Sequence, residues 1–196
     1  YQASFNVRDI SAAQFLRVLD TGRELTGSMS LEGELTAKGD SFAEIKASSL
    51  GNVKLHCEKG SLRKFALLSK LFSVLNVSQL FKFRLPDMVS GGMPYNQITA
   101  SFAFRDGVVT TNDLFIDSNA MNISMVGNFD LVKEQLEVTI GVKPLQTVDK
   151  VISRIPVVGW VLTGKNKSLI TAYFTARGSL DNPTVTPVTV TSLAKG

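Results

Sequence analysis

The chain has 196 residues, of which 44% are hydrophobic, and a formal net charge of +4 with an isoelectric point near 9.2. This length is sufficient for one substantial core, and no shift in composition marks a boundary, so we expect a single domain over residues 1–196. The scattered basic residues permit anionic partners without identifying one. No run of 18 or more apolar residues occurs, which excludes a transmembrane helix within this sequence.

The N-terminal segments are predicted to form strands separated by short helices. Apolar and polar residues alternate over residues 1–8, which predicts a strand; this start lacks the zones of a signal peptide, so we expect the chain to begin inside a larger protein. Residues 12–19 have helical spacing, and residues 25–38 carry the clearest strand pattern of this half. A short helix over residues 41–48 is predicted to lead into a strand over residues 52–59.

The longest helical pattern covers residues 62–76, where apolar side chains occupy roughly half of the circumference. These side chains are Phe65, Leu67, Leu68, Leu71, Phe72, Val74 and Leu75. So broad an apolar arc favours packing against a sheet, with basic side chains at the rim. Contact with the head groups of an anionic membrane is the alternative, because basic residues border the helix on both sides.

Residues 97–143 carry the most informative pattern, a run of segments in which apolar and polar side chains alternate. Successive strand residues point to opposite faces, so these segments predict a four-stranded antiparallel meander with one apolar and one polar face. The sequence Arg105-Asp106-Gly107 predicts a tight hairpin turn, and residues 117–119 and 130–134 supply the next reversals. The expected fold class is α+β, a curved antiparallel sheet with one apolar face and several amphipathic helices.

Ten side chains share the apolar phase of this meander and are the candidate lipid-binding residues. They are Phe102, Phe104, Leu114, Ile116, Ile123, Met125, Phe129, Leu136, Val138 and Ile140. A twisted sheet whose apolar face stays open can hold acyl chains, and each buried methylene contributes about 0.8 kcal/mol. If helices cover the face, the same side chains form an ordinary closed core. The residues alone leave both alternatives open.

The C-terminal segments are predicted to form a second amphipathic helix and a last strand. Pro144 suits a first helical position, residues 145–155 carry an apolar stripe, and the strand is expected over residues 168–178. The stripe continues into a short apolar segment, the candidate for membrane contact. Its residues are Val157, Val158, Trp160, Val161 and Leu162. Flanking basic residues suit an anionic membrane surface, and packing onto the sheet is the alternative.

Catalytic and metal-binding chemistry is disfavoured by the residues that are missing. The only histidine, His56, falls on the polar phase of its strand with Lys54 and Glu58, whereas the only cysteine, Cys57, falls on the apolar phase. One histidine and one cysteine make no zinc site, and no phosphate-binding or nucleophile motif occurs. We therefore expect no enzyme activity, metal or cofactor, and Cys57 as a buried thiol. The basic residues do not cluster with aromatic ones, which argues against nucleic acid.

Several short motifs follow one another in an order that resembles a known family. They are Leu55-His56-Cys57-Glu58-Lys59-Gly60, Gly92-Met93-Pro94-Tyr95, Phe102-Ala103-Phe104-Arg105-Asp106-Gly107, Asp113-Leu114-Phe115-Ile116-Asp117-Ser118, Val126-Gly127-Asn128-Phe129-Asp130-Leu131, Val142-Lys143-Pro144-Leu145, Ile155-Pro156-Val157-Val158-Gly159 and Gly178-Ser179-Leu180-Asp181-Asn182-Pro183. Each motif alone is weak, and their order over about residues 41–183 is the specific feature. In this order the chain resembles the C-terminal region of AsmA-like proteins, in particular their YhdP-like branch.

This resemblance implies a periplasmic location in a Gram-negative bacterium, as part of a protein anchored in the inner membrane. It implies a β-groove that moves phospholipid between the inner and outer membranes without catalysis. The partners implied are phospholipid and the preceding repeats of the same protein, with a membrane surface and an envelope protein as further candidates. The alternative is a closed structural or interaction domain that supports outer-membrane biogenesis without binding lipid.

Overall fold

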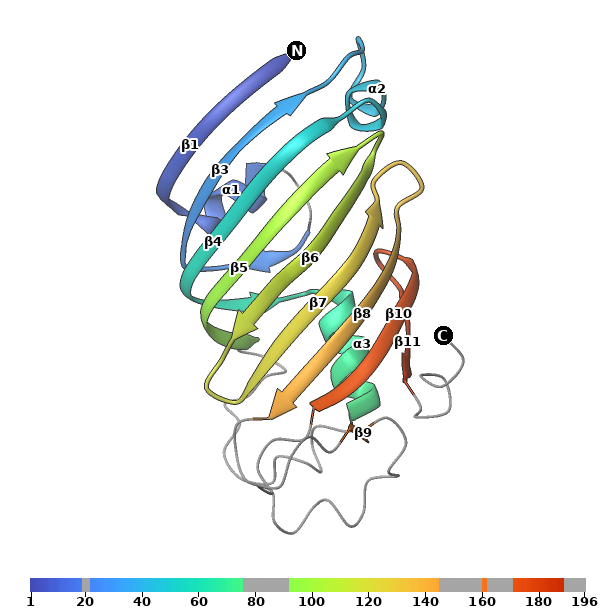
Figure 1. The fold of residues 1–196 in the computed structure, drawn as a ribbon. Coiled ribbons are helices and arrows are strands. Elements are labelled where there is room, and N and C mark those ends of the chain that lie inside the picture. The colour runs from blue at the N-terminus through green and yellow to red at the C-terminus, as the bar shows by residue number, and fades with distance from the viewer. Residues whose placement is uncertain (19–21, 76–91, 145–159, 162–170, 189–196) are drawn as a thin grey trace.

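A computed structural model describes residues 1–18, 22–75, 92–144, 160–161 and 171–188. Within these residues, eleven strands form one antiparallel sheet in the order β1-β3-β4-β5-β6-β7-β8-β10-β11, with β2 paired to β4 and β9 paired to β10. The strands are β1 (Gln2–Ser11), β2 (Glu24–Leu25), β3 (Ser28–Thr36), β4 (Leu50–Arg63), β5 (Met93–Arg105), β6 (Val108–Asp117), β7 (Met121–Asp130), β8 (Gln135–Pro144), β9 (Trp160–Val161), β10 (Thr171–Ser179) and β11 (Thr184–Pro187). The helices are α1 (Ala12–Val18), α2 (Phe42–Ala47) and α3 (Ala66–Leu75). The sheet is open and twisted, with β1 and β11 at its edges (Figure 1).

The predicted fold class and meander are confirmed. Strands β5 to β8 are neighbours in chain order, and each ladder between them is antiparallel. Asp106 and Gly107 both have positive φ, 49° and 78°, as expected for a two-residue turn between strongly twisted strands. The predicted short helix at residues 41–48 is α2, whose N-cap Ser41 accepts a hydrogen bond from the Glu44 N–H at 3.2 Å.

The sheet bends where glycines let neighbouring strands approach closely. A Cβ added at Gly51 would lie 2.0 Å from the Glu34 carbonyl oxygen, and one at Gly127 would lie 2.3 Å from the Glu137 carbonyl oxygen. Both glycines also have positive φ, 144° and 142°, a conformation that side chains disfavour. A larger residue at either position would push the neighbouring strand away, so the close approach of these strands requires glycine.

Two predicted helix starts are wrong. Leu62 remains in β4, where it pairs with Met93 of β5 and Leu25 of β2, and α3 begins only at Ala66. An apolar residue at this position is compatible with a strand or a helix. It is part of a strand here because neighbouring strands pair with β4 on both sides. Pro144 ends β8 opposite Met121 instead of beginning a helix. The helix predicted over residues 145–155 lies outside the described residues.

The core lies between the sheet and helices α1 and α3, which the strands partly hide in Figure 1. Helix α3 contributes Leu68, Leu71 and Leu75, and it contacts the edge strand β11. Fully buried Ile123 of β7 and Ile140 of β8 belong to the same core cluster. The core therefore extends from β3 to β11, and on β3 and β4 it lies at the end of the strands opposite α2.

Candidate functional site

The strand registers define the apolar face row by row, because directly paired residues point to the same side of a sheet. Across β1, β3, β4 and β5 the rows are Ala3, Leu35, Gly51 and Phe104; Phe5, Gly33, Val53 and Phe102; and Val7, Leu31, Leu55 and Ala100. The rows continue across β6, β7 and β8, where most of the candidate lipid-binding residues lie. The first row, for example, continues through Val109, Phe129 and Leu136. The ten candidate residues therefore share one face with side chains from β1, β3 and β4.

The part of this face formed by β6, β7 and β8 is mostly buried. Six candidate residues are only 0–6% exposed, namely Ile116, Ile123, Met125, Leu136, Val138 and Ile140. They belong to the same core cluster as Leu71 of α3. Leu114 and Phe129 are partly exposed, yet they too pack against this cluster. These eight side chains therefore contribute mainly to the core in this structure, and few of their atoms are within reach of a ligand.

Toward the α2 end of β1, β3, β4 and β5 the face is partly exposed, and we call this part the open apolar surface. At the other end of β3 and β4 the same face is core, where Met29 and Cys57 are 2% and 0% exposed. The open apolar surface consists of Phe5, Val7, Leu31, Leu35, Leu55, Phe102 and Phe104, all of intermediate exposure. Leu31 and Leu55 also pack against the core cluster, so they form the border between the two parts of the face. Phe102 and Phe104 were candidates from the sequence, whereas the other five were not. Alternation over residues 1–8, 25–38 and 52–59 identifies them as apolar strand residues. Their position beside Phe102 and Phe104 depends on the strand order, which a local pattern does not contain.

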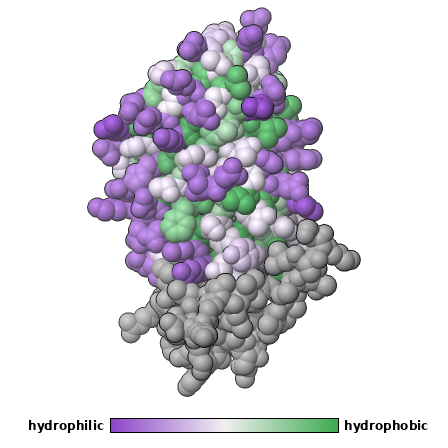
Figure 2. Space-filling view, viewed as in Figure 1, coloured by the Kyte–Doolittle hydropathy of each residue, from purple (hydrophilic) through white to green (hydrophobic). Residues whose placement is uncertain are grey.

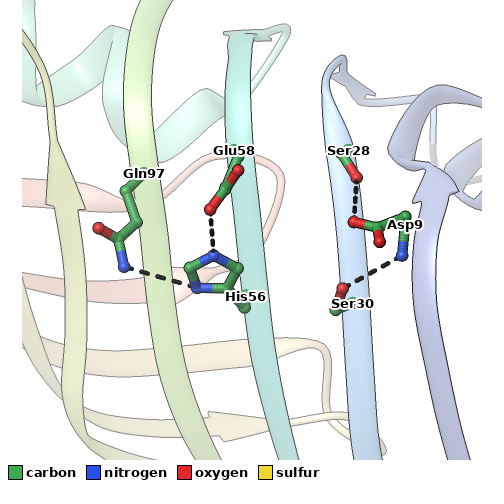
Figure 3. A network of polar contacts seen from close by, with 6 residues as sticks. All are labelled: Asp9, Ser28, Ser30, His56, Glu58 and Gln97. Carbon is green, nitrogen blue, oxygen red and sulfur yellow. Dashed lines mark hydrogen bonds and ion pairs between the residues drawn. The ribbon is translucent and has the colours of Figure 1, made fainter.

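The opposite face of the same strands is polar, as predicted. In Figure 3, His56 contacts the Glu58 carboxylate at 2.9 Å and Gln97 at 3.5 Å, while the Ser28 hydroxyl donates to the Asp9 carboxylate at 3.2 Å. The hydrogen bond with His56 is the main cause that lowers the pKa of Glu58. Figure 2 shows hydrophilic side chains along both margins of the sheet, with paler and apolar residues between them. These pairs hold exposed side chains in place on the solvent side.

Cys57 and His56 are neighbours on β4 with opposite environments. Cys57 is fully buried, and burial raises the pKa of its thiol to about 11. A protonated, inaccessible thiol is a poor nucleophile. Within the described ranges, no group of three or more His, Cys, Asp or Glu side chains could hold a metal ion.

Only two of the five candidate membrane-contact residues fall in the described part of the chain. Trp160 and Val161 form β9, pairing with Ala172 and Thr171 of β10, so here the chain is extended and does not continue a helical stripe. Pairing with β10 explains the extended backbone, because it supplies backbone hydrogen bonds that an exposed helix end would lack. Val157, Val158 and Leu162 lie outside the described residues. Among the helices described, none has the length and apolar character needed to cross a membrane.

Comparison with known proteins gives one match to a family. The family model described as "YhdP protein" matches residues 5–185, which is most of the chain. Searches among curated proteins and among solved structures gave no match. The matched range includes all seven residues of the open apolar surface; it begins at Phe5 of β1 and ends at Val185 of β11.

Proposed function

The chain belongs to the YhdP protein family, an AsmA-like family with an envelope-related function, and on this premise we propose that it is a lipid-transport module. In this proposal, phospholipid acyl chains lie on the open apolar surface while the head groups stay in water. The module acts in the periplasm, as part of a protein anchored in the inner membrane, and passes phospholipid between the inner and outer membranes.

The observation that carries the proposal is the partial exposure of seven large apolar side chains on one face of four neighbouring strands, around the buried Val53. At about 4.8 Å between strands, the four strands β1, β3, β4 and β5 span roughly 14 Å. Burying only five methylenes of an acyl chain on such a surface would contribute about 4 kcal/mol. Exposed apolar side chains are common one at a time, but a contiguous set on one face indicates a binding surface.

The proposed module acts without catalysis. The strongest nucleophile available, Cys57, is buried with a raised pKa, and the imidazole of His56 is engaged by Glu58 on the solvent side. Neither group faces the open apolar surface, because Cys57 lies in the core and His56 on the opposite face. Holding and releasing a lipid needs apolar contact area and no bond-making group.

Site-specific photo-crosslinking in cells tests the proposal. A photoreactive side chain at Phe5, Leu35 or Phe104 should capture phospholipid, because these positions lie on the open apolar surface. The same group at Ser101 or Thr139, exposed on the polar face, should not. If none of the three positions on the open apolar surface captures lipid, the proposal is wrong.

One observation favours a second candidate function, a closed domain that supports outer-membrane biogenesis without binding lipid. The face under β6 to β8 is as buried as an ordinary core, with Ile123 and Ile140 fully inaccessible. Denaturing mass spectrometry of the purified domain separates the two functions. Co-purified phospholipid supports transport, whereas a lipid-free domain in which Phe5 and Phe104 crosslink only to protein supports the closed domain.

A further inference from the structure

Several turns and one helix meet at one end of the sheet, beside the open apolar surface. Helix α2 joins β3 to β4, the turn at Asp106 and Gly107 joins β5 to β6, and residues 131–134 join β7 to β8. Backbone hydrogen bonds connect these elements, from the Asp106 N–H to the Ser49 carbonyl at 3.0 Å and from the Leu131 N–H to the Gly107 carbonyl at 2.8 Å. Figure 1 shows α2 and both turns at the same end of the strands.

Large apolar side chains project from this end into solvent. Phe42 of α2 is 73% exposed, and Val132 in the β7–β8 turn is 54% exposed. The two elements are close, because a Cβ built at Gly107 would lie 2.6 Å from a Val132 methyl carbon and 3.3 Å from the Ala47 Cα. The ammonium group of Lys46 lies 5.4 Å from the centre of the Phe42 ring. We call Phe42, Lys46, Arg105, Val132 and Lys133 the hairpin-tip rim.

The charges at this end nearly balance, and some of them are engaged within the protein. Four basic residues, Lys38, Lys46, Arg105 and Lys133, stand against five acidic ones, Asp40, Glu44, Asp106, Asp130 and Glu134. The Asp130 carboxylate accepts the N–H groups of Val132 and Lys133 at 3.0 and 2.8 Å, and it pairs with the Lys133 ammonium at 3.2 Å. The Glu44 carboxylate accepts the Asp40 N–H at 2.9 Å. Docking at the rim is therefore driven by its apolar side chains more than by net charge.

The rim lies next to the open apolar surface along the chain and in space. Phe104 precedes the β5–β6 turn by two residues, and Leu35 lies at the end of β3 that leads into α2. Apolar side chains at turn tips, with charged side chains of both signs beside them, suit the boundary between head groups and acyl chains of a bilayer. We propose that the hairpin-tip rim inserts into a membrane surface, which places the open apolar surface beside the acyl chains of that membrane.

This inference rests on the proposed function and names the membrane contact of the same site. It differs from the membrane contact predicted at residues 157–162, which depends on flanking basic residues and on anionic lipid. Insertion at the rim requires only apolar contact, so it should occur on neutral bilayers and persist in salt.

Environment-sensitive fluorescence on the full chain tests the inference. Phe42→Cys and Val132→Cys, each labelled with a nitrobenzoxadiazole dye, should show a blue shift with neutral phosphatidylcholine vesicles and quenching by spin-labelled lipid. Cys57 is fully buried, so labelling goes to the introduced thiol. Val126→Cys is the matched control, because Val126 is 42% exposed on the polar face, away from the rim.

A second variant pair makes the result independent of the dye. Phe42→Ser with Val132→Ser should weaken vesicle binding roughly tenfold, because two apolar side chains no longer insert. Phe115→Ser with Val126→Ser, both exposed on the polar face, should leave binding unchanged. Unshifted dyes at positions 42 and 132, or binding that salt abolishes and the rim variant does not affect, would overturn the inference.

Different results would disprove the lipid-transport proposal and the membrane contact at the rim. Lipid captured at Phe104 without dye shifts at the rim would overturn the membrane contact and leave lipid holding intact. Photo-crosslinks from positions 42 and 132 to protein alone, in cells, would also overturn it and assign the rim to a protein partner.

Discussion

At the scale of single residues, the alternation along one strand decides which side chain meets water and which meets the core. His56 and Cys57 are adjacent on β4, yet His56 contacts Glu58 on the polar face and Cys57 is fully buried. The strand period of two was visible in the sequence, and it placed both side chains on the faces where the structure has them. The chemistry of each group follows from that placement.

Cys57 should behave as an inert thiol in the folded protein. At pH 8, iodoacetamide should alkylate urea-unfolded protein rapidly and native protein only as fast as it opens. Because folding raises the pKa of this thiol to about 11, from an ordinary value of about 8.5, the folded state holds the proton more tightly. The free energy of unfolding should therefore fall as pH rises between these values, and Cys57→Ala should remove that part of the slope. Rapid alkylation of native protein would contradict the burial.

Charges placed on the two faces of the meander should have very different costs. Ile123→Asp or Val138→Asp puts a carboxylate at a position 0 or 2% exposed and should lower the free energy of unfolding by more than about 3 kcal/mol. Ser124→Asp or Thr139→Asp, one position along each strand and exposed, should change it by about 0.5 kcal/mol or less. Urea unfolding measures both, and equal effects on the two sets would mean that the faces are misassigned.

At the scale of elements, α3 decides which part of the apolar face is core. The broad apolar arc predicted a helix that packs on a sheet, and Leu68, Leu71 and Leu75 are buried as that prediction requires. The helix begins at Ala66 and not at Leu62, because Leu62 stays in the β4 ladder. Glu24 of β2 pairs with Arg63 and Lys64 just before α3, which fixes the turn into the helix.

Shortening a buried side chain of α3 should destabilise the whole domain. Leu71 is fully buried, so Leu71→Ala should cost about 2–5 kcal/mol through lost contacts and the cavity left behind. Lys70→Ala, its exposed neighbour, should cost about 0.5 kcal/mol or less. Thermal unfolding of both variants checks this. A small loss at Leu71 would indicate that α3 is a detachable cover and that the face beneath it is available to lipid.

At the scale of the molecule, one apolar face has two parts with different roles. Toward β11 the face is closed by the core, whereas toward β1 seven side chains keep partial contact with solvent. The edges differ as well: β1 has ten residues, while β11 has four and ends at Pro187, which has no N–H to donate. The open apolar surface thus lies on the side of the longer edge strand, and the hairpin-tip rim lies at one end of its strands.

The local features of this protein follow from patterns in its sequence. Alternation identified the strands of the meander and their faces, the Asp106-Gly107 pair identified the hairpin, and the order of short motifs identified the family, because each depends on residues close together in the chain. Only the tertiary structure decided which apolar residues are core and which are accessible. That division depends on the order β1-β3-β4-β5, which brings Phe5 and Leu35 beside Phe102 and Phe104, and on α3, whose core cluster includes Val138. Both depend on contacts between segments far apart in the chain. A periodic pattern of apolar residues, with period two or 3.6, carries information only about neighbouring residues and cannot predict such contacts.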